Sequence, residues 1–180
     1  MPRTDNPHSL RLIAAVSRRA GAAAADELAR SHPLSKSADA DKKAHWACEV
    51  CKVLEKQFDA DTASAIRRDC RCGDGATMAK EIRACIAKAE NLADGCALFT
   101  TKNKYAFLEY ISEHEVLFGY HACVCSCVKR AAEPVPLLWC ECSAGYAETM
   151  LRQALGSDVH ATLRKSAKSG ADRCEFLINW

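Results

Sequence analysis

The chain carries five cysteines between residues 123 and 142, and this group constrains the structure more than any other sequence feature. Cys123, Cys125 and Cys127 precede a proline-containing segment, and Cys140 and Cys142 follow it. Two cysteines spaced C-x-C are poorly placed to bridge each other, because a disulfide requires a narrow range of Cα separations and Cβ directions. Convergent thiolates are ligands for zinc and for iron–sulfur clusters. The pattern therefore predicts a thiol-rich site that closes around the proline-containing segment.

Composition narrows the class of protein. With 180 residues and 49% hydrophobic content, the chain can bury a core without disulfides as staples. The net charge is +2, which gives no basic surface for nucleic acid. No apolar run approaches the roughly 20 residues of a membrane span. We therefore expect neither nucleic acid nor a membrane as a partner.

The first residues bear on localisation. Arg18 and Arg19 precede a run of alanines, as in a twin-arginine export signal, but Asp26 and Glu27 interrupt the apolar run. We interpret the segment as a helix or an arm and expect a cytoplasmic, reducing location. Twelve cysteines in such a compartment indicate metal binding or catalysis rather than disulfides.

Apolar spacing predicts helices first and strands afterwards. Helices are expected over residues 9–31 and 44–58, over a short segment capped by Asp59 or Asp61 that ends near Gly73, and over 76–89. Residues 105–120 favour extended structure, Ser143 caps a helix that ends at Gly156, and residues 158–166 and 173–180 form a β-hairpin. The fold class is therefore α+β: N-terminal helices packed on a small antiparallel sheet with a C-terminal helix and β-hairpin. We expect an N-terminal helical arm and linker over 1–43 and one cysteine-rich ligand- or metal-binding domain over 44–180.

The motifs of residues 44–180 resemble those of a known group. They comprise Tyr120 before Cys123 and Cys125, the run Cys140-Glu-Cys-Ser-Ala-Gly-Tyr146, a serine- and glycine-containing turn at Lys165–Gly170, Cys174-Glu-Phe-Leu-Ile178, and, upstream, Ile66-Arg-Arg-Asp-Cys-Arg-Cys72-Gly. This order resembles a group of uncharacterised cysteine-rich prokaryotic proteins. Their C-terminal half is similar to the 4-vinyl-reductase-type small-molecule-binding domain and to the L-2-amino-thiazoline-4-carboxylic acid hydrolase family. The resemblance implies a ligand- or metal-binding α+β domain and no particular reaction. Cys127 is an extra thiol, and His121 replaces a frequent proline.

The candidate metal ligands fall into two clusters. Cys123, Cys125, Cys127, Cys140 and Cys142 can hold zinc or, alternatively, an iron–sulfur cluster. Four thiolates around zinc would make a closed structural site, whereas three would leave a reactive position. Cys48, Cys51, Cys70 and Cys72 form either a second four-sulfur site or packed core thiols. Both clusters can also converge on one centre. The alternative is a purely structural role, in which several of these cysteines are small buried apolar residues, as we expect of Cys85 and Cys174.

Two functions compete. The first is a metal- or small-molecule-binding protein that takes a soft ion or a thiophilic small molecule, with a homodimer as one assembly to test. The second is a small-molecule hydrolase or lyase that uses Cys127 as nucleophile or an open metal site, with His121 or Glu141 transferring the proton. A thiol–disulfide protein is a third interpretation. Few polar groups converge for catalysis in the sequence, which favours binding.

Overall fold

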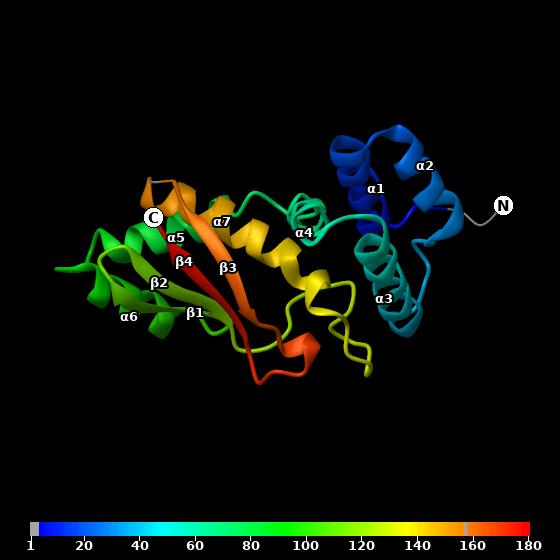
Figure 1. The fold of residues 1–180 in the computed structure, drawn as a ribbon. Helices are drawn as coiled ribbons and strands as arrows, with labels where there is room; N and C mark the ends of the chain where they lie inside the picture. The colour runs from blue at the N-terminus through cyan, green and yellow to red at the C-terminus, as the bar shows by residue number, and fades with distance from the viewer. Residues whose placement is uncertain (1–3, 157) are drawn as a thin grey trace. The chain divides into compact units, whose positions relative to one another are not determined.

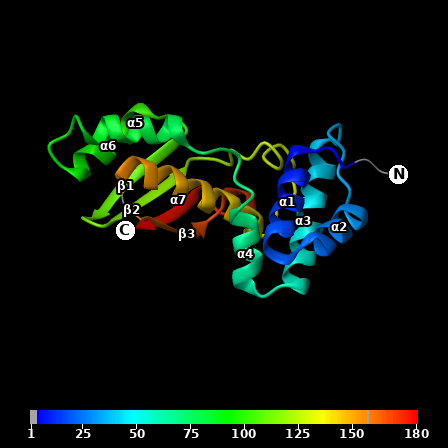
Figure 2. The ribbon, with the colours of Figure 1, turned by 90° about the horizontal axis from the view of Figure 1, so that it is seen from above.

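The computed structural model describes residues 4–156 and 158–180, and their contacts divide them into two compact units. The helical unit consists of residues 4–71 and 125–142, and the sheet unit consists of residues 72–124 and 143–180 apart from residue 157. The chain thus passes between the two units three times. Figures 1 and 2 show the elements of each unit from two directions.

The helical unit contains four α-helices and one 3-10 helix among the described residues: α1 (Pro7–Ala20), α2 (Ala22–Ser31), α3 (Ala40–Gln57), α4 (Ala60–Arg68) and η1 (Leu137–Cys140). Polar side chains cap three of these helices at their N-termini. Asn6, Asp39 and Asp59 each accept a hydrogen bond from a backbone N–H of the first turn. Of the two predicted caps for α4, Asp59 is therefore the one in place.

The sheet unit contains α5 (Ala76–Ile86), α6 (Leu92–Lys102), η2 (Ala167–Ser169) and four strands. These are β1 (Ala106–Ser112), β2 (Glu115–Tyr120), β3 (His160–Lys165) and β4 (Cys174–Asn179), paired antiparallel in the order β1-β2-β4-β3. Helix α7 (Glu141–Leu155) starts with two residues of the helical unit and continues in the sheet unit. The predicted α+β class and the C-terminal β-hairpin are confirmed.

One face of the sheet makes the core of the sheet unit. Phe118 and Phe176 stack at 6.2 Å between β2 and β4, and apolar residues of α5, α6 and α7 bury against this face. Cys85 and Cys174 belong to this core at 6% and 8% exposure, which confirms the apolar role predicted for them.

Several predicted elements differ from the observed ones. The helix expected over 9–31 is two helices, because Gly21 adopts a φ of 90° between them. Gly73 does not end α4 in the left-handed region; Gly75, with a φ of 74°, precedes α5 instead. Ser143 lies inside α7 rather than at its cap, since the turn of η1 already starts that helix at Glu141. The boundary predicted between residues 43 and 44 falls within α3.

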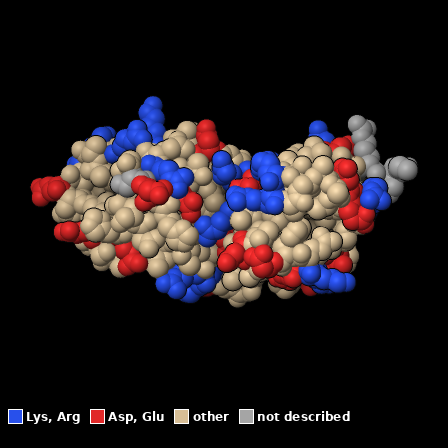
Figure 3. Space-filling model, turned by 45° about the horizontal axis from the view of Figure 1, so that its top comes forward, with Lys and Arg blue, Asp and Glu red and all other residues tan. Residues whose placement is uncertain are grey.

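One face of the molecule shows no separation of positive from negative charge. On the face drawn in Figure 3 basic and acidic side chains are interspersed, with uncharged surface between them. None of the helices in the described part of the chain combines the length and the apolar character that a bilayer crossing needs.

Candidate functional site

Seven of the nine cysteines predicted as metal ligands belong to the helical unit. These are Cys48, Cys51, Cys70, Cys125, Cys127, Cys140 and Cys142, while Cys72 and Cys123 belong to the sheet unit. The helical unit therefore takes thiols from both sequence clusters. Cys51, Cys70, Cys127 and Cys142 are the most buried of them, at 0, 4, 2 and 8% exposure.

A buried arginine lies within electrostatic range of several of these thiols. Arg67 is 2% exposed on α4, and its Nη2 donates a hydrogen bond of 2.7 Å to the carbonyl oxygen of Trp139. Its guanidinium carbon lies 3.9 Å from the centre of the Trp139 ring, a cation–π contact. Its Nε has no hydrogen-bond partner, and no carboxylate among the described residues pairs with the guanidinium. An arginine this buried is rare without a paired anion.

Four thiols supply the electrostatic environment of that guanidinium. Burial disfavours the charged form of Arg67, but Cys142, Cys70, Cys51 and Cys125 favour it when they are ionised, and the pKa of Arg67 is held above its ordinary value. We call these four residues the Arg67 thiol cluster. The cluster contains Cys51 and Cys70 of the first sequence group and Cys125 and Cys142 of the second, all within electrostatic range of one cation.

Two thiols of the cluster, those of Cys51 and Cys70, have raised pKa values. Burial raises the pKa of Cys51 to about 12, although the charge of Arg67 opposes the shift. Burial raises the pKa of Cys70 as well, again against the effect of Arg67, and the Cys70 thiol donates to the carbonyl of Ile66 at 3.2 Å. Near neutral pH the thiols of Cys51 and Cys70 are therefore protonated and offer the guanidinium no full negative charge.

The remaining candidate residues have structural contacts. The Cys48 thiol donates to the carbonyl oxygen of Pro134 at 3.7 Å and so ties α3 to the proline-containing segment. Glu141 forms an ion pair of 3.0 Å with Arg68, both side chains being largely buried. Cys140 is the last residue of η1 and is half-buried.

The three catalytic candidates are divided between the two units, with Cys127 and Glu141 in the helical unit and His121 in the sheet unit. Cys127 is 2% exposed, and burial raises the pKa of its thiol to about 12, the opposite of what a nucleophilic cysteine needs. Glu141 is engaged with Arg68. His121 belongs to the sheet unit, where its ring tilts against Phe107 at 5.4 Å.

Metal binding by the nine cysteines stays a prediction. Within the parts of the chain that the structure describes, no three histidine, cysteine, aspartate or glutamate side chains are already arranged as a metal site. Side chains of the Arg67 thiol cluster would have to rotate to meet at one ion.

Sequence reasoning missed Arg67, although a signal for it exists. Ala63, Ile66, Arg67 and Cys70 are spaced i, i+3, i+4 and i+7, which places them on one helical face. All four are buried. A charged residue in such an apolar stripe is the pattern to look for.

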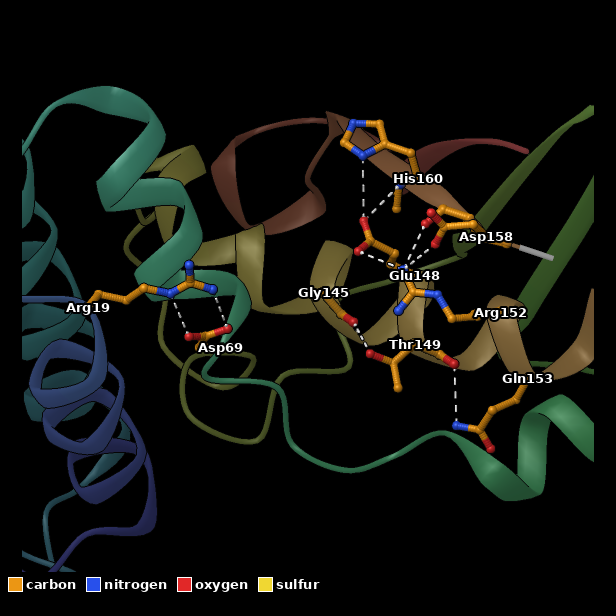
Figure 4. Close-up of polar contacts among 11 residues, drawn as sticks. Arg19, Asp69, Gly145, Glu148, Thr149, Arg152, Gln153, Asp158 and His160 are labelled. Carbon is orange, nitrogen blue, oxygen red and sulfur yellow. Dashed lines mark hydrogen bonds and ion pairs between the residues drawn. The ribbon is translucent and has the colours of Figure 1, made fainter. Parts of the chain in front are cut away.

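A second polar group missed in the sequence ties α7 to β3 in the sheet unit. Figure 4 shows Arg152 between Glu148 and Asp158, at 3.6 and 3.0 Å. Glu148 also accepts a hydrogen bond of 3.2 Å from the backbone of Ala161 and lies 3.7 Å from His160. Because every carboxylate already has a partner and Asp158 is 96% exposed, we assign this group to holding α7 on the sheet.

The fold and the cysteine pattern define an α+β protein with a thiol-rich helical unit. Residues 8–179 match the model of a family of unknown function, DUF6144, and the chain belongs to that family. No curated protein matches the sequence significantly.

The chain is also similar to solved structures of an H-NOX domain from Shewanella oneidensis. The NMR structure of a point mutant in the Fe(II)CO ligation state is 12% identical, with 98% of each chain covered and a TM-score of 0.49. The crystal structure in the Fe(II)NO ligation state is 13% identical, with 97% of this chain and 98% of that chain covered and a TM-score of 0.44.

Proposed function

We propose that this protein binds a thiophilic metal ion at the Arg67 thiol cluster, with zinc as the ion and an iron–sulfur cluster as the alternative. The observation that carries the proposal is the buried Arg67 guanidinium, which has four thiols within electrostatic range and, in the described part of the chain, no carboxylate partner. Cys127 and Cys48 of the same unit are additional or exchangeable ligands.

Charge compensation gives the physical reason. A buried charge that lacks a counter-ion costs several kcal/mol, roughly, even after the surroundings relax. A metal ion displaces protons from its thiol ligands, since only the thiolate is a ligand. Four thiolates and a divalent zinc ion carry a net charge of about −2, which the guanidinium partly neutralises. Metal binding and the burial of Arg67 therefore stabilise each other.

The unpartnered donors support the same conclusion. Arg67 Nε and Trp139 Nε1 are both buried without a hydrogen-bond partner. Buried N–H groups usually have one. Thiolate sulfurs are acceptors for such groups, and hydrogen bonds to ligand atoms orient the ligands of a metal centre.

The proposal requires reduced thiols and hence a reducing compartment such as the cytoplasm. The resemblance of the C-terminal half to the 4-vinyl-reductase-type ligand-binding domain fits a binding role, with a thiophilic small molecule in place of the ion. A hydrolase or lyase is less well supported, because the candidate nucleophile Cys127 is buried and its thiol has a raised pKa.

Metal analysis of protein purified without oxygen tests the proposal. We expect one strongly held zinc ion per chain, or visible absorption if an iron–sulfur cluster is present. The double variant Cys70→Ser and Cys142→Ser should lose that ion, whereas Cys96→Ser, a buried thiol of the sheet unit, should keep it. Arg67→Met should weaken metal binding because the thiolates lose their counter-charge. Metal binding at the Arg67 thiol cluster would be refuted if the double variant retained the metal. It would also be refuted if wild-type protein with all cysteines reduced took up no metal.

A further inference from the structure

We propose that the outer face of the sheet is the interface of a reversible homodimer. Two leucines at the centre of this face would pack against those of a second copy, and the acidic half of one face would meet the basic half of the other. The outer face is the side of the sheet opposite the core that contains Phe118 and Phe176. The proposal is independent of the Arg67 thiol cluster, because the residues that carry it belong to the sheet unit.

Strand register identifies the residues of the outer face. Phe118 and Phe176 belong to the core, and successive side chains of a strand point to opposite faces. Leu117 and Leu177 therefore lie on the outer face, where they are paired between β2 and β4. The row that contains them crosses all four strands in the order Glu109, Leu117, Leu177 and Thr162.

The core does not account for the two leucines. Leu117 and Leu177 are half-buried, and neither is part of the apolar cluster between the sheet and its helices. They form an apolar centre with charged and polar residues around it. A protein–protein interface has this arrangement, with an apolar centre inside a polar rim.

Charge divides the outer face into two halves. Glu109 of β1 and Glu115 of β2 make one half acidic, while β3 contributes Lys165 and, when it is protonated, His160 to the other half. The side chains of Glu109, Lys165 and His160 are 47, 48 and 66% exposed. Each half therefore offers accessible charge of one sign to a second copy.

Glu175 of β4 does not disturb this division. Its carboxylate accepts a hydrogen bond of 2.7 Å from Arg173 Nε and lies 3.4 Å from Lys165 Nζ, so its charge is compensated within the chain. Arg173 also donates to Glu109 at 3.0 Å and lies over the Phe107 ring at 4.4 Å. These contacts hold Glu109 and Lys165 at opposite sides of the face.

A twofold axis along the strands makes the face self-complementary. An axis that runs between β2 and β4 places Leu117 over Leu177 of the second copy, and Glu109 over Thr162 in the basic half. An axis across the strands would instead place Glu109 over its own counterpart. Like charges repel, so the charge distribution selects the axis along the strands. Such an isologous contact closes after two copies, and two stacked sheets pack with nearly aligned strands.

Side chains already occupy part of both sheet edges. On β1, Thr100 Oγ1 accepts from the N–H of Leu108 at 2.9 Å and donates to its carbonyl oxygen at 2.8 Å. On β3, the Glu148 carboxylate accepts from the N–H of Ala161 at 3.2 Å. Edges protected in this way resist pairing with another strand. A second copy is therefore expected on the face of the sheet rather than at an edge.

The size of the face sets the strength of the contact. Four strands of six or seven residues make a face of roughly 400 Å². A stable interface buries about 800 Å² per partner, so we expect weak and reversible association. The measurement must therefore extend to high protein concentration.

Analytical ultracentrifugation of the full-length protein tests the interface. A reducing agent prevents disulfides between copies, and a concentration series should show a monomer–dimer equilibrium. Leu177→Asp should weaken association at least about tenfold, because it places an unpaired carboxylate between apolar side chains. The matched control is Leu10→Asp on α1, where Leu10 is 50% exposed, and it should leave association unchanged.

Position 162 tests the arrangement of charges. Thr162→Lys should strengthen association about two- to fivefold, because the new ammonium group faces Glu109 of the second copy, and Thr162→Glu should weaken it by a similar factor. Adding Glu109→Lys to Thr162→Glu should strengthen association again.

Two results overturn the interface itself. The first is a wild type that stays monomeric at every concentration, and the second is a Leu177→Asp variant that folds by circular dichroism and dimerises as the wild type does. Equal effects of Thr162→Lys and Thr162→Glu would overturn the axis along the strands.

Discussion

His8 links helix α1 to the cysteine-rich loop that contains Ser126 through one hydrogen bond, and a second hydrogen bond, from Arg11 of the same helix, holds its ring. Arg11 Nη2 donates to His8 Nδ1 at 3.0 Å, and His8 Nε2 lies 3.2 Å from the Ser126 hydroxyl. Because Nδ1 accepts from a guanidinium, the imidazole is neutral. Burial, with the charges of Arg11, Arg67 and Lys43, lowers the pKa of His8 to about 4. The cysteine-rich loop is therefore held by a histidine that must stay deprotonated.

Acid should weaken this link. The pKa of His8 is 6.5 as an ordinary value and about 4 in the folded chain, so the unfolded chain binds the proton first. The contribution of neutral His8 to the free energy of unfolding is present above pH 6.5. It is lost as the pH falls towards 4 and changes no further below that pH. Denaturant unfolding at several pH values should show a steeper loss of stability for the wild type than for His8→Gln.

The carboxylates do not disturb this comparison. Their titration is common to the wild type and His8→Gln, so it cancels in the difference between the two pH profiles. Equal slopes for the wild type and His8→Gln would show that His8 does not titrate as the structure requires.

At the same scale, the sequence shows which thiols are candidates but not which of them lie within electrostatic range of Arg67. The number and spacing of the cysteines identified all nine candidate metal ligands. Which of the nine thiols belong to the Arg67 thiol cluster depends on where Arg67 lies. Arg67 is buried beside Trp139, a residue 72 positions further along the chain. No local pattern encodes that pairing, so only the structure could separate the Arg67 thiol cluster from the other cysteines.

Among the elements, α6 shows why some helices escape prediction. It contains Gly95 and, in its last turn, Thr100 and Thr101, all weak helix formers. A Cβ at Gly95 would lie 2.8 Å from the Cα of Ile86, so the glycine allows α5 and α6 to pack closely. Helix α4, in contrast, was predictable from its cap, because Asp59 accepts from the N–H of Thr62 at 2.8 Å. Local signals predict an element well when tertiary packing does not oppose them.

Strand β2 contains a glycine with a specific packing role. A Cβ at Gly119 would lie 2.2 Å from the carbonyl oxygen of Cys174 and 2.3 Å from the ring of Phe107. We therefore expect Gly119→Ala to destabilise the sheet unit by about 2 kcal/mol or more, since one of the clashing atoms is backbone. Thermal unfolding should show a melting temperature lower by about 5 °C or more.

Gly73 offers a matched control in the same unit. A Cβ there has nothing within 4 Å, and its φ is not positive. Gly73→Ala should melt within about 2 °C of the wild type, as expected of a surface substitution. If Gly119→Ala has the same melting temperature as Gly73→Ala, the register of β2 against β4 is not the one described.

For the whole molecule, the order of the chain does not follow the order of the units. Residues 125–142 lie within the second half of the sequence but belong to the helical unit. Periodicity and turn residues report on neighbours in the sequence and cannot reveal such an exchange. The expected division at residue 43 used the polar linker before it as the boundary, the only signal that the sequence offers there.

The interleaved units predict how fragments behave. A fragment of residues 4–71 keeps α1 to α4 but lacks Trp139, which is 1% exposed and packs edge-on against Trp46 at 5.8 Å. Loss of a buried tryptophan costs about 3 to 5 kcal/mol, comparable to the whole stability of so small a unit. The fragment should unfold without a cooperative transition in circular dichroism, whereas the same fragment joined by a glycine–serine linker to residues 125–142 should regain one. A fragment 4–71 that melts as sharply as the joined protein would mean that the segment with Trp139 only covers a unit that folds without it.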